Sequence, residues 1–161
     1  MFNLKAEFYL KIIFLFSFIA LISAFFIEYI LGHQPCNLCL IERIPYGLSI
    51  MIIMAIFLIR KNQKFLVMLL ILTFIFSFAI SFYHFGIEQG FFQESSVCGV
   101  KSSTKIVTKE DLLKQLSEKT ISCRDVTFRI FGLSLTSINI VISLLFILTL
   151  IKIFKEYEKN K

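Results

Sequence analysis

Residues 34–43 read Gln-Pro-Cys-Asn-Leu-Cys-Leu-Ile-Glu-Arg and lie between two apolar runs, 12–31 and 44–59. A helix needs about 20 apolar residues to cross a bilayer, and the cysteine stretch completes the second run to that length. Pro35 suits a first helical turn, because its missing N–H would have no partner there. Cys36, Cys39 and Arg43 would then share one helix face, where the helix dipole and the guanidinium both favour a thiolate. The stretch therefore predicts a reactive dithiol at the membrane boundary.

Other roles for a Cys-x-x-Cys pair compete with this one. Cys98 and Cys123 lie far apart and form no second closely spaced pair, so a four-cysteine zinc site is disfavoured and no metal is expected. Leu40 stands where a c-type haem attachment would need histidine. A structural disulfide or two packed thiols stay open on these residues alone.

The composition indicates a membrane protein. Of 161 residues, 57% are hydrophobic and 20 are phenylalanine, whereas about 45–50% apolar residues is usual in a soluble domain. Further apolar runs extend over 65–85 and 130–151. We therefore expect an all-α fold, a single integral membrane domain over 1–161 that forms a four-helix transmembrane bundle. Its spans are predicted at about 12–31, 41–59, 65–85 and 130–151, with outer loops at about 32–40 and 86–129.

The first apolar run could belong to a signal peptide. It continues through residues 25–27, past the length of a signal-peptide apolar core, so we expect an uncleaved first span.

Basic residues cluster at the ends of the apolar runs, which is a topology signal. They stand before the first run, between the second and third, and after the fourth, at Lys5, Lys11, Arg60, Lys61, Lys64, Lys152, Lys155, Lys159 and Lys161. The N- and C-termini are therefore expected in the cytoplasm, and all four cysteines on the opposite side, where disulfides persist. The net charge of +6 is explained in this way, and no nucleic-acid partner is expected.

The second outer loop holds a short amphipathic pattern. Thr108 and Asp111 resemble a capping box, and leucines then recur at helical spacing at 112, 113 and 116. We expect a short amphipathic helix on the membrane surface, between Cys98 and Cys123.

The cysteines allow three pairings, and local geometry favours Cys36–Cys39, which leaves Cys98–Cys123. Two redox pairs on one side of a membrane domain fit electron relay by thiol–disulfide exchange. The pair on the outer loop can reach a soluble partner, and the pair at the head of the second span can meet a lipid-soluble acceptor.

These residues resemble the bacterial DsbB disulfide-forming proteins over nearly the whole chain. The resemblance rests on residues 35–43, 83–90 (Tyr-His-Phe-Gly-Ile-Glu-Gln-Gly), 97–98, 122–125 (Ser-Cys-Arg-Asp) and 131–134 (Phe-Gly-Leu-Ser). It implies a quinone-dependent oxidoreductase of the bacterial inner membrane, with its active cysteines periplasmic. Such a protein reoxidises a periplasmic thioredoxin-like oxidase (DsbA-like) and passes the electrons to a membrane quinone, ubiquinone or menaquinone.

The resemblance also implies a role for each matching residue. Cys98 matches the cysteine attacked by the oxidase, and Cys123 the one that exchanges with Cys36. Cys39 matches the thiolate that faces the quinone. Arg43 matches an arginine beside the quinone ring, and His84 lies where the family places a histidine near the quinone site.

Two polar residues near these motifs carry separate expectations. Glu42 would raise the pKa of a neighbouring thiol, so we interpret it as a head-group or partner contact rather than as part of the site. Asn139, inside the fourth run, is expected to form an interhelical hydrogen bond.

Two rival functions remain. One is a vitamin K epoxide reductase-like membrane oxidoreductase, although in that family the active pair lies at the fourth span, which has no cysteine here. The other is a non-enzymatic assembly protein whose disulfides only fasten the outer loop.

Overall fold

A computed structural model describes residues 4–59, 62–93, 98, 122–124, 129–130 and 133–159. Within them, four helices are long and apolar enough to span a membrane: α1 (Leu4–Tyr29), α2 (Asn37–Leu58), α3 (Gln63–Glu88) and α5 (Leu135–Lys159). The predicted all-α transmembrane bundle is thereby confirmed. The expected amphipathic helix at 108–118 lies outside the described residues.

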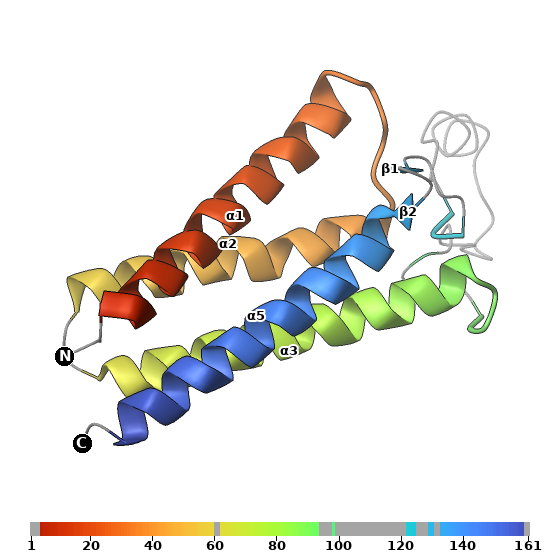
Figure 1. Cartoon of the computed structure of the whole chain (residues 1–161). Coiled ribbons are helices and arrows are strands. Elements are labelled where there is room, and N and C mark those ends of the chain that lie inside the picture. The colour runs from red at the N-terminus through yellow and green to blue at the C-terminus, as the bar shows by residue number, and fades with distance from the viewer. Residues whose placement is uncertain are drawn as a thin grey trace, which may run out of the picture.

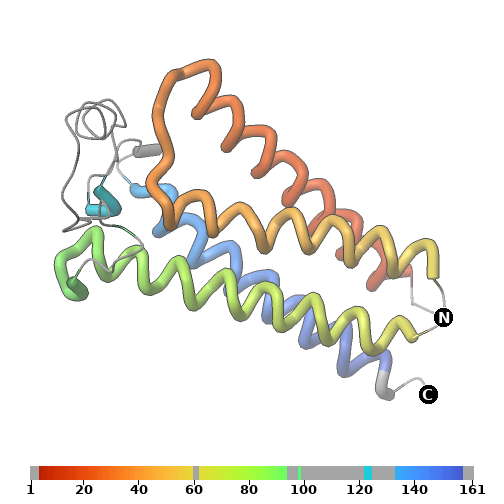
Figure 2. Tube along the Cα trace, turned by 180° about the vertical axis from the view of Figure 1, so that it is seen from behind, coloured from red at the N-terminus to blue at the C-terminus, as the bar shows by residue number. Residues whose placement is uncertain are grey.

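Successive helices run in opposite directions, so the start of α1 and the end of α5 lie at the same end of the bundle (Figure 1). α3 packs against both α2 and α5, whereas α1 packs mainly against α2. Toward its C-terminal end α1 diverges from α2, and residues 30–36 bridge the opening (Figure 2). The two cysteines of α2 lie at this open end, opposite the start of α1.

The helix bounds differ from the apolar runs because capping groups, not hydropathy, set where a helix begins. The fourth run begins at Ile130, but α5 begins at Leu135, since the Ser134 hydroxyl accepts the Ser137 N–H at 3.2 Å. Upstream, Arg129–Ile130 (β1) and Leu133–Ser134 (β2) form a short antiparallel pair. This turn leads the outer segment into the bundle.

Packing inside the bundle combines one apolar cluster with small polar contacts. Large buried side chains, including Ile53, Leu70 and Phe74, fill the half nearer the start of α1. Serine pairs join the helices across the interior: Ser17 to Ser49 at 3.0 Å, and Ser77 to Ser143 at 3.2 Å. Small residues let helices approach closely in lipid, where the hydrophobic effect no longer drives them together.

The end of α3 is closed by a tight turn. Gly90 has a φ of 77°, which glycine adopts readily, and the Gly86 carbonyl accepts the N–H groups of Phe91 and Phe92 at 2.8 and 3.1 Å. The Phe92 ring stacks on Tyr83 and occupies the place that a side chain at position 86 would need. This turn holds Phe91 and Phe92 against the last turns of α3.

Candidate functional site

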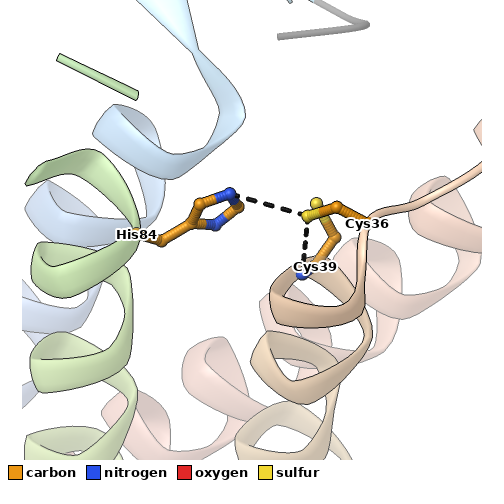
Figure 3. Close-up of side chains that lie close together, drawn as sticks. All are labelled: Cys36, Cys39 and His84. Carbon is orange, nitrogen blue, oxygen red and sulfur yellow. Dashed lines mark hydrogen bonds between the residues drawn. The ribbon is translucent and has the colours of Figure 1, made fainter. Parts of the chain in front are cut away.

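The Cys-x-x-Cys motif forms the start of α2. Cys36 is the N-cap, in an extended conformation, and its sulfur accepts the Cys39 backbone N–H at 3.2 Å (Figure 3). The helix therefore begins at Asn37, and Pro35 precedes the cap instead of occupying the first turn as we expected. The physical reason is that a cysteine sulfur here takes the place of the oxygen that usually caps a helix.

Cys36 is the better-stabilised thiolate of the pair. The thiol and the backbone N–H of Cys39 both donate to its sulfur and lower the pKa of Cys36, against the opposing effects of burial and of the Glu42 carboxylate. Hydrogen bonds to the charged form lower a pKa in this way. The negative charge is therefore favoured at Cys36, at the very start of the helix.

His84 of α3 faces this sulfur across the bundle. Its Nε2 lies 3.6 Å from Cys36 Sγ (Figure 3). Its Nδ1 lies 2.8 Å from Glu42 Oε1. The side chains of His84 and Glu42 are only 3% and 12% exposed. The expectation that Glu42 points to head groups or a partner is therefore wrong: Glu42 faces the bundle interior and orients the imidazole.

A chain of buried polar groups continues into α5. The Asn139 amide donates to Glu42 Oε2 at 3.2 Å and to Ser81 at 2.7 Å, and its oxygen accepts a hydrogen bond from the Tyr46 hydroxyl. Asn139 thus forms the interhelical hydrogen bonds predicted for it, and it also fixes the second oxygen of Glu42.

Glu88 completes this polar network. The Thr136 hydroxyl donates to Glu88 Oε1 at 2.7 Å, and the same oxygen lies 3.9 Å from His84 Nε2. Oε2 of Glu88 is buried and has no hydrogen-bond partner among the described residues. The resulting pair of buried carboxylates, Glu42 and Glu88, gives the surroundings of His84 a negative character.

The other two cysteines are bonded to each other. Cys98 and Cys123 form a disulfide with their Cα atoms 5.5 Å apart. Both are buried in one cluster with Cys36, Leu38 and Ile87. The fold thus brings the outer-loop pair against the pair at the head of α2.

Cys36 and Cys39 are free thiols, so the predicted Cys36–Cys39 disulfide is not formed in this structure. The pair is held instead by the hydrogen bonds that cap α2. In this structure the outer pair is therefore bonded and the inner pair is not.

A cavity of about 250 Å³ opens where α1 diverges from α2. Its walls come from the second half of α1, residues 33–35, the first turns of α2 and the start of α5, and they include Cys39, Arg43 and Asn139. Cys36 and His84 are not among its lining residues. The cavity therefore meets the dithiol at Cys39.

Arg43 is held at the edge of this cavity. Its guanidinium forms an ion pair with Glu28 of α1 and lies over the Phe25 ring, 5.3 Å from the centroid. Both ion-pair side chains are largely buried, at 17% and 22% exposed. Glu28 is the single charged residue in the first apolar run, and its ion pair with Arg43 joins α1 to α2.

Comparisons with known proteins identify the family of this chain. A family model described as "Disulfide bond formation protein DsbB" matches residues 6–153. The chain belongs to the DsbB family. It is 31% identical over 147 residues to "Uncharacterized protein RP370" of Rickettsia prowazekii (strain Madrid E), a match that covers 90% of this chain and 86% of that protein. No solved structure matches.

Membership of the DsbB family makes this chain a multi-pass membrane protein of disulfide bond formation. Several polar residues of the site carry no role in the sequence-based prediction: Glu28, Tyr46, Glu88 and Thr136. A usable signal existed for Glu28, because an ionisable residue within a membrane span is costly and marks a function by default. Glu88 lies in the stretch 83–90 that carries the family resemblance, but no role was assigned to it there. Thr136 lies inside the fourth apolar run, and nothing in the sequence distinguished it.

Proposed function

We propose that this DsbB-family protein reoxidises a periplasmic thioredoxin-like (DsbA-like) dithiol oxidase and passes the electrons to a membrane quinone. The observation that carries the proposal is the contact between the two cysteine pairs in one buried cluster, with Cys39 exposed to a separate cavity. One pair can then exchange with a protein while the other meets a small acceptor.

The exchange steps balance as dithiol–disulfide transfers. A partner thiolate attacks Cys98, breaks the Cys98–Cys123 bond and leaves a mixed disulfide with Cys123 as thiolate. The second partner thiol resolves the mixed disulfide, so the partner leaves oxidised and the outer pair holds two electrons and two protons. Cys123 then attacks Cys36 of an oxidised inner pair, and Cys98 resolves that bond. The outer disulfide is restored, and Cys36 and Cys39 become thiols, as in the arrangement seen here.

The cavity fits a quinone head group. Its volume of about 250 Å³ is below the ~300–1,000 Å³ typical for whole drug-sized ligands, so it would take the ring rather than an entire tailed quinone. Its walls are mostly apolar, and Cys39 and Arg43 supply a thiol and a positive charge. A bound quinone would accept two electrons and two protons from the dithiol.

Arg43 would favour negative charge on the acceptor in a medium of low dielectric constant. The Glu28 carboxylate fixes the guanidinium and offsets part of its charge. His84 and Glu42 stand on the Cys36 side, where the imidazole can take the thiol proton as the inner pair is oxidised.

The decisive experiment is quinone reduction by the purified protein, driven by a reduced thioredoxin-like protein, with each cysteine replaced by serine in turn. We expect every replacement to abolish steady-state quinone reduction. Activity that survives loss of Cys39 would overturn the proposal. Failure to reduce any quinone while the disulfides remain intact would instead favour the structural role that the sequence left open.

The orientation is part of the same proposal. The basic residues between α2 and α3 and after α5 support a cytoplasmic location for that end of the bundle. The cysteines would then face the periplasm of a bacterial inner membrane. A reporter fused near Asn62 should read as cytoplasmic, and a periplasmic signal there would refute this orientation.

A further inference from the structure

Three metal-binding atoms converge at the head of α2. The sulfurs of Cys36 and Cys39 and a ring nitrogen of His84 lie within 4.8 Å of one another. Cys36 Sγ and His84 Nε2 are 3.6 Å apart. In a tetrahedral zinc site with Zn–S near 2.3 Å and Zn–N near 2.05 Å, a sulfur and a nitrogen ligand are separated by about 3.6 Å. Cys36 and His84 are therefore already held at the ligand spacing of a zinc site, with the Cys39 sulfur close by.

The imidazole is also oriented as a metal ligand. Glu42 Oε1 lies 2.8 Å from His84 Nδ1, and a carboxylate can only accept, so in the neutral ring Nδ1 carries the proton. Nε2 then directs its lone pair toward Cys36. Metal-ligating histidines are commonly held in this way by a carboxylate on the other ring nitrogen. Asn139 in turn holds the second oxygen of Glu42 at 3.2 Å.

The surroundings favour a cation. Glu88 is 6% exposed, its Oε1 lies 3.9 Å from His84 Nε2, and its buried Oε2 has no hydrogen-bond partner in the described part of the chain. A buried carboxylate oxygen without a partner is costly unless it meets a proton or a cation. Glu88 is thus placed beside the other three to supply a compensating negative charge.

We propose that the reduced Cys36–Cys39 pair and His84 form a Zn²⁺ site, with the buried Glu88 carboxylate beside it as a compensating negative charge. Two thiolates and an imidazole suit zinc, whereas Mg²⁺ and Ca²⁺ prefer oxygen ligands. Binding forms two Zn–S bonds and releases the thiol protons; it oxidises nothing. A Cys36–Cys39 disulfide has no thiolate to offer, so the site exists only in the reduced protein. Bound zinc holds the pair reduced and blocks its onward electron transfer.

The test measures zinc binding by the full chain in detergent. A Cys98→Ala/Cys123→Ala variant leaves Cys36 and Cys39 as the only thiols. It is reduced, freed of reductant without oxygen, and titrated with Zn²⁺ against a chromophoric chelator. We expect one ion per chain, with proton release, and no binding after the pair is oxidised. Co²⁺ in place of zinc should give thiolate-to-metal charge-transfer absorption.

Single replacements separate this site from simple dithiol chelation. Glu42→Gln should lower zinc affinity by about 10–100-fold, as expected when a group that orients a ligand is lost, and His84→Gln should lower it further. His33→Gln, which changes the other histidine of the chain, is the matched control and should leave affinity unchanged. Equal binding by the oxidised protein, no binding by the reduced protein, or unchanged affinity in both His84→Gln and Glu42→Gln would overturn the proposal. None of these outcomes bears on quinone reduction, which is measured without zinc.

Discussion

Asn139 links three helices through one side chain, and replacing it tests how the polar network supports the bundle. Asn139→Leu keeps the volume similar and removes bonds to Tyr46 and Glu42 of α2 and to Ser81 of α3. Interhelical hydrogen bonds in membrane proteins contribute about 0.6 kcal/mol each on average, so three give about 2 kcal/mol. The loss should exceed this value, because Glu42 Oε2 is left without its amide donor in a largely buried position.

The assay is reversible unfolding in mixed micelles, from which the free energy of unfolding is obtained for each variant. Thr149→Val is the matched control on the same helix. The Thr149 hydroxyl is exposed and bonds only to the Leu145 carbonyl of its own helix, so its removal should change stability by less than about 0.5 kcal/mol. If Asn139→Leu were no more destabilising than Thr149→Val, the inference that this network joins the helices would be refuted.

Three further predictions concern the chemistry. Arg43→Met should weaken apparent quinone affinity strongly and Arg43→Lys moderately, since lysine keeps the charge but loses the planar fork. Neither replacement should affect single-turnover oxidation of the partner. If Arg43→Met left the quinone dependence unchanged, Arg43 would only anchor the helix at the membrane interface. Cys123→Ala should trap a mixed disulfide between Cys98 and the oxidase because the resolving thiol is missing, and trapping through Cys36 instead would reverse the assignment. In a chain lacking Cys98 and Cys123, alkylation of Cys36 should reach half its maximal rate at lower pH in Cys39→Ser, which keeps a hydroxyl donor, than in Cys39→Ala. The reason is that only the thiolate reacts and that hydrogen bonds from Cys39 lower the pKa of Cys36. If the two variants gave the same pH profile of alkylation, the side chain at position 39 would not be a cause of the lowered pKa.

The four spans were predictable because continuous apolar runs of bilayer length leave few alternatives to a helix. The ends of these spans were less predictable from the sequence. α5 begins after Ser134, a common N-cap residue, and that signal was present in the sequence. Cys36 is not a usual cap, so the start of α2 depended on a sulfur–backbone hydrogen bond that residue preferences do not describe.

The site was predictable only in part. The cysteine spacing placed the dithiol at the head of a span, but the position of His84 beside it came from family resemblance alone. The prediction for Glu42 was wrong because the direction of its side chain depends on which face of α2 meets α3. That choice is made by contacts between helices distant in sequence, such as the bond from Glu42 to His84, 42 residues away. Local patterns carry no information about such contacts.

Gly86 carries no functional group, yet its missing side chain shapes the turn at the end of α3. Phe92 fills the space beside it and stacks on Tyr83, one residue before His84. A methyl group at position 86 would displace that ring from its stack on Tyr83, while leaving all four sulfurs chemically intact. Because Tyr83 packs against the cluster that holds Cys36, Cys98 and Cys123, a displaced ring would disturb the packing where the two cysteine pairs meet. The contact between these pairs thus depends in part on a position that has no side chain.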